Sequence, residues 1–200
     1  MPAHLHILLL AAGASSRMRG RDKLMEEVQG RALLRHLAIQ ALSTGLAVAV
    51  TLPPDRPLRG AVLDGLTLIR IPVADAHDGL SASLRAGLAV IAPEHSVMVL
   101  LADLPELDAA DLASMARAQA RHPAAILRGA AQDGTPGHPV IFPPWARAEL
   151  AALSGDEGAK PVLKAHAAQI RLVPLPYFHA TTDLDTPEDW AGWRERQARR

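Results

Sequence analysis

A loop of small and basic residues directly follows the first apolar run of the chain. It extends from Ala12 to Lys23, and its first five residues are all alanine, glycine or serine. Small residues let backbone N–H groups come close to a phosphate, and Arg17 and Lys23 supply the positive charge that a triphosphate requires. The loop matches neither the P-loop pattern GxxxxGK[ST] nor the dinucleotide fingerprint GxGxxG. It predicts a phosphate-binding loop of another type, with a solvated basic turn as the alternative.

Carboxylates follow two other segments that are expected to be extended. Asp103 comes after the apolar run Val97–Ala102, and Asp183 and Asp185 alternate in an acidic turn ahead of a helix. A hard oxygen ligand at the end of a strand suits Mg²⁺ that bridges protein and phosphates. Capping of the turn before Pro105 is the other explanation for Asp103. The alternation lets Asp183 and Asp185 point to one face, but helix capping explains part of this segment equally well.

Three further segments have the composition of a binding site. Ser81 and Ser83 lie at a predicted helix start, which suits an anion or a base edge, although ordinary capping explains each serine alone. Residues 134–140 and 155–160 are dense in Gly, Pro and polar side chains, as is typical of loops that line a site. His138 in the first of these loops is either a site residue or a hydrogen-bonded core histidine.

Short apolar runs alternate with segments of helical periodicity, which is typical of a mostly parallel sheet covered by helices on both faces. A short strand of different packing at residues 138–142 is expected as an insertion into this sheet. In open parallel sheets, ligands bind beyond the carboxyl ends of the strands, where both the basic loop and Asp103 fall. The predicted strands are Leu5–Ala11, Leu46–Leu52, Thr67–Ile71, Val97–Ala102 and Ala124–Leu127.

Capping residues predict where the helices between these strands begin and end. Gly45 lies where a C-terminal cap belongs, and Asp108 can cap the helix before the fifth strand. Thr186, followed by proline, starts a final helix that carries Trp190 and Trp193. We expect this last helix to close the core.

The composition limits the class of protein. The 200 residues are 49% hydrophobic, which suits one core and therefore a single domain over residues 1–200. Lys plus Arg equals Asp plus Glu at 21 each, so no overall field attracts nucleic acid or an anionic membrane. Cysteine is absent, and the apolar run Ile7–Ala12 is too short to span a bilayer. We therefore expect a cytoplasmic protein without disulfides or thiolate metal sites.

Six motifs, taken together and in order, resemble the MocA- and MobA-like nucleotidyltransferases of molybdenum-cofactor maturation. The resemblance covers almost the whole chain. It implies a Rossmann-like three-layer α/β/α sandwich, like that of nucleotide-diphospho-sugar transferases, and a Mg²⁺-dependent nucleotidyltransferase activity. The motifs are LLLAAGASSRM with Lys23, GLSASLRAGL, LLADLP, GHPVIF, GDEGAK and DLDTPEDW.

The resemblance also implies a role for each matching residue. Catalysis would involve Arg17, Lys23 and Asp103. Nucleotide binding would involve Leu10, Ala11, Ala12, Gly13, Arg17, Lys23, Ser81 and Ser83. The acceptor side would be shaped by His138, Pro139, Asp156, Gly158 and Lys160. The Mg²⁺ ligands would be Asp103 and Asp185, with Asp185 favoured over Asp183.

The choice of nucleotide follows from the first motif. An LAAG start resembles the cytidylyltransferase branch and LAGG the guanylyltransferase branch, and this chain has LAAG at residues 10–13. The expected reaction therefore transfers CMP from CTP to the terminal phosphate of molybdopterin and releases pyrophosphate. One departure is that the common pattern RMGxxK fits only if the loop from Arg17 to Lys23 is one residue longer.

Alternatives remain open. The same chemistry could use a sugar phosphate or another small phosphorylated acceptor, or GTP as the donor. A nucleotide-binding regulator without catalysis is a second class, against which Lys23, Asp103 and Asp185 argue. An NAD-dependent oxidoreductase is a third, and it lacks the glycine fingerprint. A transient protein that hands over the cofactor is a possible partner, but no motif identifies it.

Overall fold

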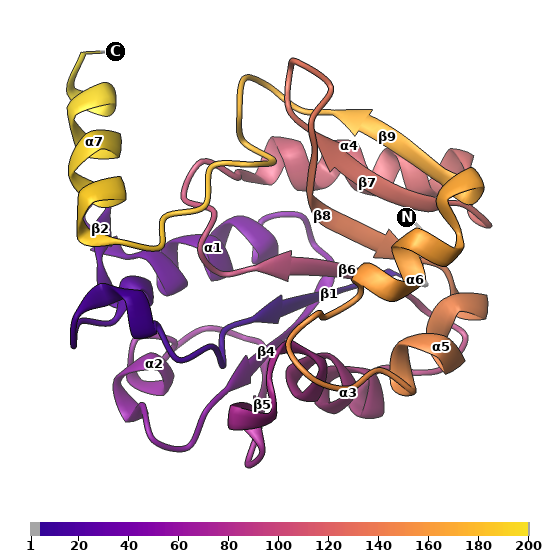
Figure 1. Cartoon of the computed structure of the whole chain (residues 1–200), viewed down its shortest axis with the longest axis horizontal. Helices are drawn as coiled ribbons and strands as arrows, with labels where there is room; N and C mark the ends of the chain where they lie inside the picture. Colours follow the sequence, from indigo (N-terminus) through magenta and orange to yellow (C-terminus); the bar gives the residue numbers. More distant parts are fainter. Residues whose placement is uncertain (1–4, 200) are drawn as a thin grey trace.

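Seven strands form one sheet in the computed structural model, which describes residues 5–199 (Figure 1). Their order across the sheet is β5-β4-β1-β6-β8-β7-β9. All neighbours are parallel except β8, which runs antiparallel to both β6 and β7. The prediction of a mostly parallel sheet is confirmed. The strands are β1 (Leu5–Leu10), β4 (Ala47–Leu52), β5 (Ile69–Pro72), β6 (Ser96–Leu101), β7 (Ile126–Ala130), β8 (Pro136–Phe142) and β9 (Ile170–Pro174).

Helices cover both faces of the sheet. Successive residues of a strand point to opposite faces, so Ile7 and Leu9 pack with α1, α4 and α7, whereas Leu8 and Leu10 pack with α3, α5 and α6. None of the helices in residues 5–199 is long and apolar enough to cross a bilayer. The helices are α1 (Leu33–Leu42), α2 (Pro57–Ala61), α3 (Leu80–Val90), α4 (Ala109–Arg121), α5 (Arg147–Ala151), α6 (Lys160–Ala165) and α7 (Pro187–Ala198).

Short elements complete the structure. A two-stranded antiparallel pair, β2 (Glu27–Val28) and β3 (Arg31–Ala32), precedes α1. The 3₁₀ turns are η1 (Ser16–Met18), η2 (Lys23–Met25), η3 (Ala76–Asp78), η4 (Pro144–Ala146) and η5 (Ala167–Gln169).

The predicted helix caps are confirmed. Asp108 and Thr186 each form a reciprocal capping box at the start of α4 and α7. Gly45 has a φ of +73° just after α1, and its N–H donates to the carbonyl of Leu42. Trp190 and Trp193 of α7 are 0% and 7% exposed, so this helix closes the core as expected.

The second half of the sheet differs from the predicted pattern. β8 is the expected insertion and lies between β6 and β7, although it begins at Pro136 rather than residue 138. Strand β9 was not predicted, because it lies at the edge of the sheet and most of its side chains are exposed. Its sequence therefore lacks the continuous apolar run by which the other strands were predicted.

A close backbone approach joins β8 to the segment that leads into α7. The N–H of His138 donates to the carbonyl of Ala180 at 2.9 Å. A Cβ atom on Gly137 would lie 1.9 Å from that carbonyl oxygen, so only glycine permits the contact. Beyond this contact, the N–H of Leu184 donates to the carbonyl of Asp103 at 3.2 Å, so the acidic segment around Asp183 and Asp185 lies beside the carboxyl end of β6.

Candidate active site

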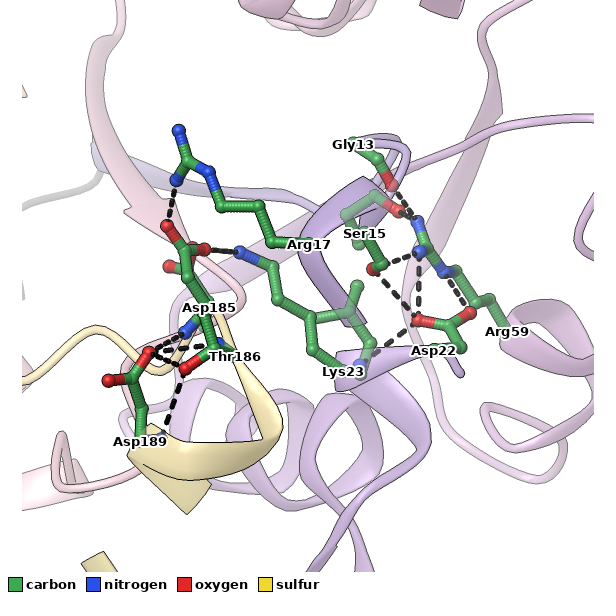
Figure 2. A network of polar contacts seen from close by, with 12 residues as sticks. Gly13, Ser15, Arg17, Asp22, Lys23, Arg59, Asp185, Thr186 and Asp189 are labelled. Atoms are coloured by element: carbon green, nitrogen blue, oxygen red, sulfur yellow. Dashed lines mark hydrogen bonds and ion pairs between the residues drawn. The ribbon is translucent and has the colours of Figure 1, made fainter. Parts of the chain in front are cut away.

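Lys23 connects the basic loop to two carboxylates that are far away in the sequence. Figure 2 shows its contact with one of them, Asp185. Its ammonium group donates to Asp103 Oδ2 and to Asp185 Oδ1, each at 2.6 Å. Arg17 pairs with the other oxygen of Asp185 from the exposed side of the loop. The structure therefore brings together the four residues that were expected to hold phosphates and metal, although their roles remain predictions.

Charge dominates this cluster. Burial by itself would lower the pKa of Lys23, but Asp103 and Asp185 outweigh burial and raise the pKa above its ordinary value. Burial acts to raise the pKa of Asp185, and the cations Lys23 and Arg17 reverse this and lower it. The pKa of Asp183 is raised, first by burial and then by the neighbouring carboxylates Asp103 and Asp185. Asp183 therefore lies within the field of the same cluster.

The carboxylates have the chemistry of a site for a divalent cation. Oxygen Oδ1 of Asp103 is buried and has no hydrogen-bond partner among residues 5–199. A buried charged oxygen without a partner is costly unless a ligand completes its coordination. Asp185 supplies a second hard oxygen ligand nearby, and Lys23 lies between the two carboxylates. The residues present thus fit Mg²⁺ or a similar ion.

A second cluster of possible ligands has a structural explanation instead. Asp108, Asp111 and His179 bring ligand atoms within 4.8 Å of one another. Asp108 and Asp111 form the capping box of α4, and His179 Nδ1 hydrogen-bonds Asp111 Oδ2 at 2.8 Å. These contacts satisfy the groups without an ion.

Two adjoining cavities flank the first part of the loop. One of about 420 Å³ extends from the loop to Asp55, His77 and Asp156. The other, of about 230 Å³, extends to Lys23 and Asp103. A further cavity of about 420 Å³ lies between β2, α1 and α7 and touches neither Lys23 nor Asp103, so it is separate from this site. The residues shared by the first two cavities are Ala12, Gly13, Leu80 and Ser83.

The predicted nucleotide-binding residues mostly line these cavities. Leu10, Ala11, Ala12 and Gly13 form the wall of the smaller one, and Ser83 faces both. Ser81 is 0% exposed and lines neither cavity. Its N–H donates to the carbonyl of Gly155, so Ser81 ties α3 to the loop at residues 155–158.

The residues predicted for the acceptor side lie in two separate places. His138 and Pro139 are in β8, where Nδ1 of His138 is buried without a partner among residues 5–199. Burial lowers the pKa of His138 to about 4, although Asp103 acts in the opposite direction. The other three residues lie by the start of α3 or on α6. Asp156 covers Gly79, Gly158 packs on Leu80, and Lys160 is an exposed residue that begins α6.

Arg59 is a residue of the site that was missed in the sequence. It lies on α2, is 0% exposed, and forms an ion pair with Asp22 in the basic loop at 2.7 Å. Nothing in the local pattern PLRGA separates it from a solvated arginine. The one signal in the sequence was Asp22, next to Lys23. A carboxylate in a phosphate-binding loop requires a cation nearby, so Asp22 indicated that a basic residue packs against the loop.

Comparisons with known proteins identify relatives of this chain in sequence and in structure. The molybdenum cofactor guanylyltransferase of Pseudomonas aeruginosa PAO1 is 38% identical over 122 residues, which cover 59% of this chain and 58% of that protein. The match thus spans less than two thirds of the relative's length. Rv0371c from Mycobacterium tuberculosis H37Rv has a similar structure, with a TM-score of 0.81 and 25% identity over 98% of this chain and 100% of that chain.

More distant structures show the same fold. The synthetase for CMP:2-keto-3-deoxy-manno-octonic acid, solved in complex with CTP, has a TM-score of 0.75 at 13% identity, covering 98% of this chain and 99% of that one. This likeness confirms the predicted nucleotide-diphospho-sugar transferase-like architecture. The profile of the MobA-like NTP transferase domain matches residues 7–170. The chain therefore belongs to the MobA-like NTP transferase family.

Proposed function

We propose that this nucleotidyltransferase moves a nucleoside monophosphate from a nucleoside triphosphate to the terminal phosphate of molybdopterin, with release of pyrophosphate. The observation that carries the proposal is the convergence of Lys23, Asp103 and Asp185, of which Lys23 and Asp103 line a cavity walled by the basic loop. The name of the P. aeruginosa relative supports the acceptor. The reaction would take place in the cytoplasm, where a handover protein would collect the product.

GTP is the donor that the relatives favour. The six relatives at the top of the comparison are all molybdenum cofactor guanylyltransferases, in contrast to the expectation of CTP. The larger cavity also supports a guanine base, because it is lined by the carboxylates of Asp55 and Asp156. One carboxylate can accept hydrogen bonds from both N1–H and the 2-amino group of guanine.

CTP is the second candidate, favoured by Ala12 in the LAAG motif. Ala12 is 4% exposed and packs with Val73 and Ala82 beneath α3. Its methyl group thus fixes the loop backbone against that helix. The motif itself resembles the cytidylyltransferase branch, so the donor has to be measured.

The proposed step is an in-line attack by an acceptor phosphate oxygen on the α-phosphorus of the donor. A P–O bond to the acceptor forms as the bond to pyrophosphate breaks, and no protein nucleophile is required. The task of the protein is to hold two anions together and to offset the charge on the leaving group. Lys23 and Arg17 supply this positive charge, and the loop backbone orients the triphosphate.

A divalent cation would be held by Asp103 and Asp185. When bound, it would neutralise phosphate charge and orient the triphosphate. The buried, unpartnered oxygen of Asp103 supports this assignment. The M. tuberculosis protein of similar fold is known in complex with manganese, an ion that takes the same oxygen ligands as magnesium.

The test is pyrophosphate release by purified protein with Mg²⁺. GTP, CTP, ATP and UTP would each be combined with molybdopterin and with a panel of sugar phosphates. Release with GTP and molybdopterin is expected; release with CTP instead would establish the second candidate. Release only with a sugar phosphate would overturn the assignment of molybdopterin as the acceptor. Nucleotide binding without any release would point to a regulator. The same assay is run on the variant Asp103→Ala. Its control is Asp64→Ala, which replaces an exposed ion-pair residue away from the site.

A further inference from the structure

Arg59 has a charged side chain with no exposure to solvent. It lies on the five-residue helix α2, directly after the turn that follows β4. Transfer of an unpaired charge into the protein interior is very costly, so such a residue requires protein partners for its whole guanidinium group. All of these partners lie in the loop between β1 and Lys23.

Each N–H of the guanidinium group has an acceptor in this loop (Figure 2). Nε and Nη2 hold the two oxygens of Asp22 at 2.7 and 2.8 Å. Nη2 also donates to Ser15 Oγ at 3.0 Å, while Nη1 donates to the carbonyl oxygens of Ala11 and Gly13 at 2.6 and 2.8 Å. A guanidinium group has five N–H donors, so none is left over.

These contacts set the direction of the peptide groups in the loop. Arg56, also beside α2, holds a third carbonyl oxygen, that of Ala14, at 2.6 Å. In a trans peptide the N–H points opposite to the C=O, and these peptides are trans. The N–H groups of Ala12, Ala14 and Ser15 therefore point away from the two arginines. Both alanines line the cavity in which a nucleotide would lie.

We propose that Arg59, with Asp22 as its charge partner, is the positioning residue of the triphosphate loop. It withdraws carbonyl oxygens, which repel phosphate, and presents N–H groups, which attract it. Because Asp22 precedes Lys23, the same ion pair fixes where the Lys23 side chain begins. The inference rests on the proposed function and identifies how its phosphate site is built. Arg59 itself is buried and contacts no substrate.

The test is Arg59→Lys, which keeps the charge but has three donors and no planar fork. Three readouts are needed: affinity for inorganic pyrophosphate with Mg²⁺ by calorimetry, hydrogen exchange of the amides in residues 11–23, and the KM for each substrate. We expect at least tenfold weaker pyrophosphate binding and faster exchange in this loop. The KM for the nucleoside triphosphate should rise, with the KM for the acceptor unchanged. Asp22→Asn is a milder second variant, with the same expected direction, in case Arg59→Lys fails to fold.

Arg147→Lys is the matched control. Like Arg59, Arg147 donates to backbone carbonyls, those of Leu88, Ile91 and Ala92, but at the far end of α3. Its replacement should lower stability without changing pyrophosphate affinity. The inference is overturned if Arg59→Lys binds pyrophosphate like the wild type, if exchange in residues 11–23 is unchanged, or if the control loses equal affinity. A wild-type protein that binds neither pyrophosphate nor nucleotide would instead remove the proposed function, and the exchange experiment would still decide whether Arg59 holds the loop.

Discussion

Lys23 lies between the two carboxylates that are proposed to hold the divalent cation, so the cation has to displace it. The Lys23→Met variant tests this competition. The ammonium group makes two hydrogen bonds of 2.6 Å to charged oxygens. Bonds of this kind contribute about 1.5–3 kcal/mol each in proteins. The three side chains are 15–25% exposed, so solvent screening reduces the sum, and we take a net of about 2–3 kcal/mol.

This net energy converts to a change in affinity. At about 1.4 kcal/mol per tenfold, removal of Lys23 should strengthen nucleotide-free Mn²⁺ binding by roughly 30- to 140-fold. In EDTA the same variant should be destabilised by about 2–3 kcal/mol, because Asp103 then loses its cation and Asp185 keeps only Arg17. Added Mn²⁺ should restore this stability, since an ion that binds only the folded state stabilises it.

The assay is calorimetric titration of Mn²⁺ together with thermal unfolding in EDTA and in Mn²⁺. Lys164→Met, which replaces an exposed lysine on α6, is the control and should change neither quantity. Mn²⁺ affinity equal to or weaker than that of the wild type would refute the reasoning. It would mean that Lys23 does not occupy the position of the cation.

Three further predictions concern the same region. Asp103→Asn should lower turnover by at least about 100-fold through loss of the cation, and near-normal pyrophosphate release would contradict its role. His138 has a folded pKa of about 4, below the ordinary 6.5, so the unfolded chain takes up a proton first as the pH falls. The free energy of unfolding should therefore be highest above pH 6.5 and fall by up to about 3 kcal/mol towards pH 4. Chemical denaturation from pH 7 to 4 should show this loss, and His138→Asn should reduce it; equal slopes for the two proteins would argue against the assignment. Gly137→Ala should cost about 1–3 kcal/mol and lower turnover, because the methyl group would push the segment at Ala180 away from β8; an unchanged melting temperature would be inconsistent with that contact.

Local sequence patterns predicted most of the fold and part of the candidate site. The apolar runs that became β1, β4 and β6 are buried on both sides, so their composition identifies them as strands without knowledge of their neighbours. Helix capping at Asp108 and Thr186 involves residues only three positions apart, so it can be predicted from the sequence as well. Lys23 and Asp103 were predictable as site residues because both follow such strands, and parallel strands end at one edge of the sheet.

Only the tertiary structure decided the features that depend on distant partners. Strand β9 has exposed side chains, and its hydrogen bonds to β7, not its composition, make it a strand. The antiparallel direction of β8 is set by pairing with β6 and β7, which periodicity does not encode.

The same distinction applies within the site. By itself, the sequence predicted a basic loop and acidic segments that could bind phosphate and metal, and the order of its motifs indicated the nucleotidyltransferase family. That Arg59 is buried under the loop rather than solvated is decided by the five acceptors that the folded loop turns towards it. An arginine is stable inside a protein only where the folded backbone satisfies all of its donors, and that condition exists only in three dimensions.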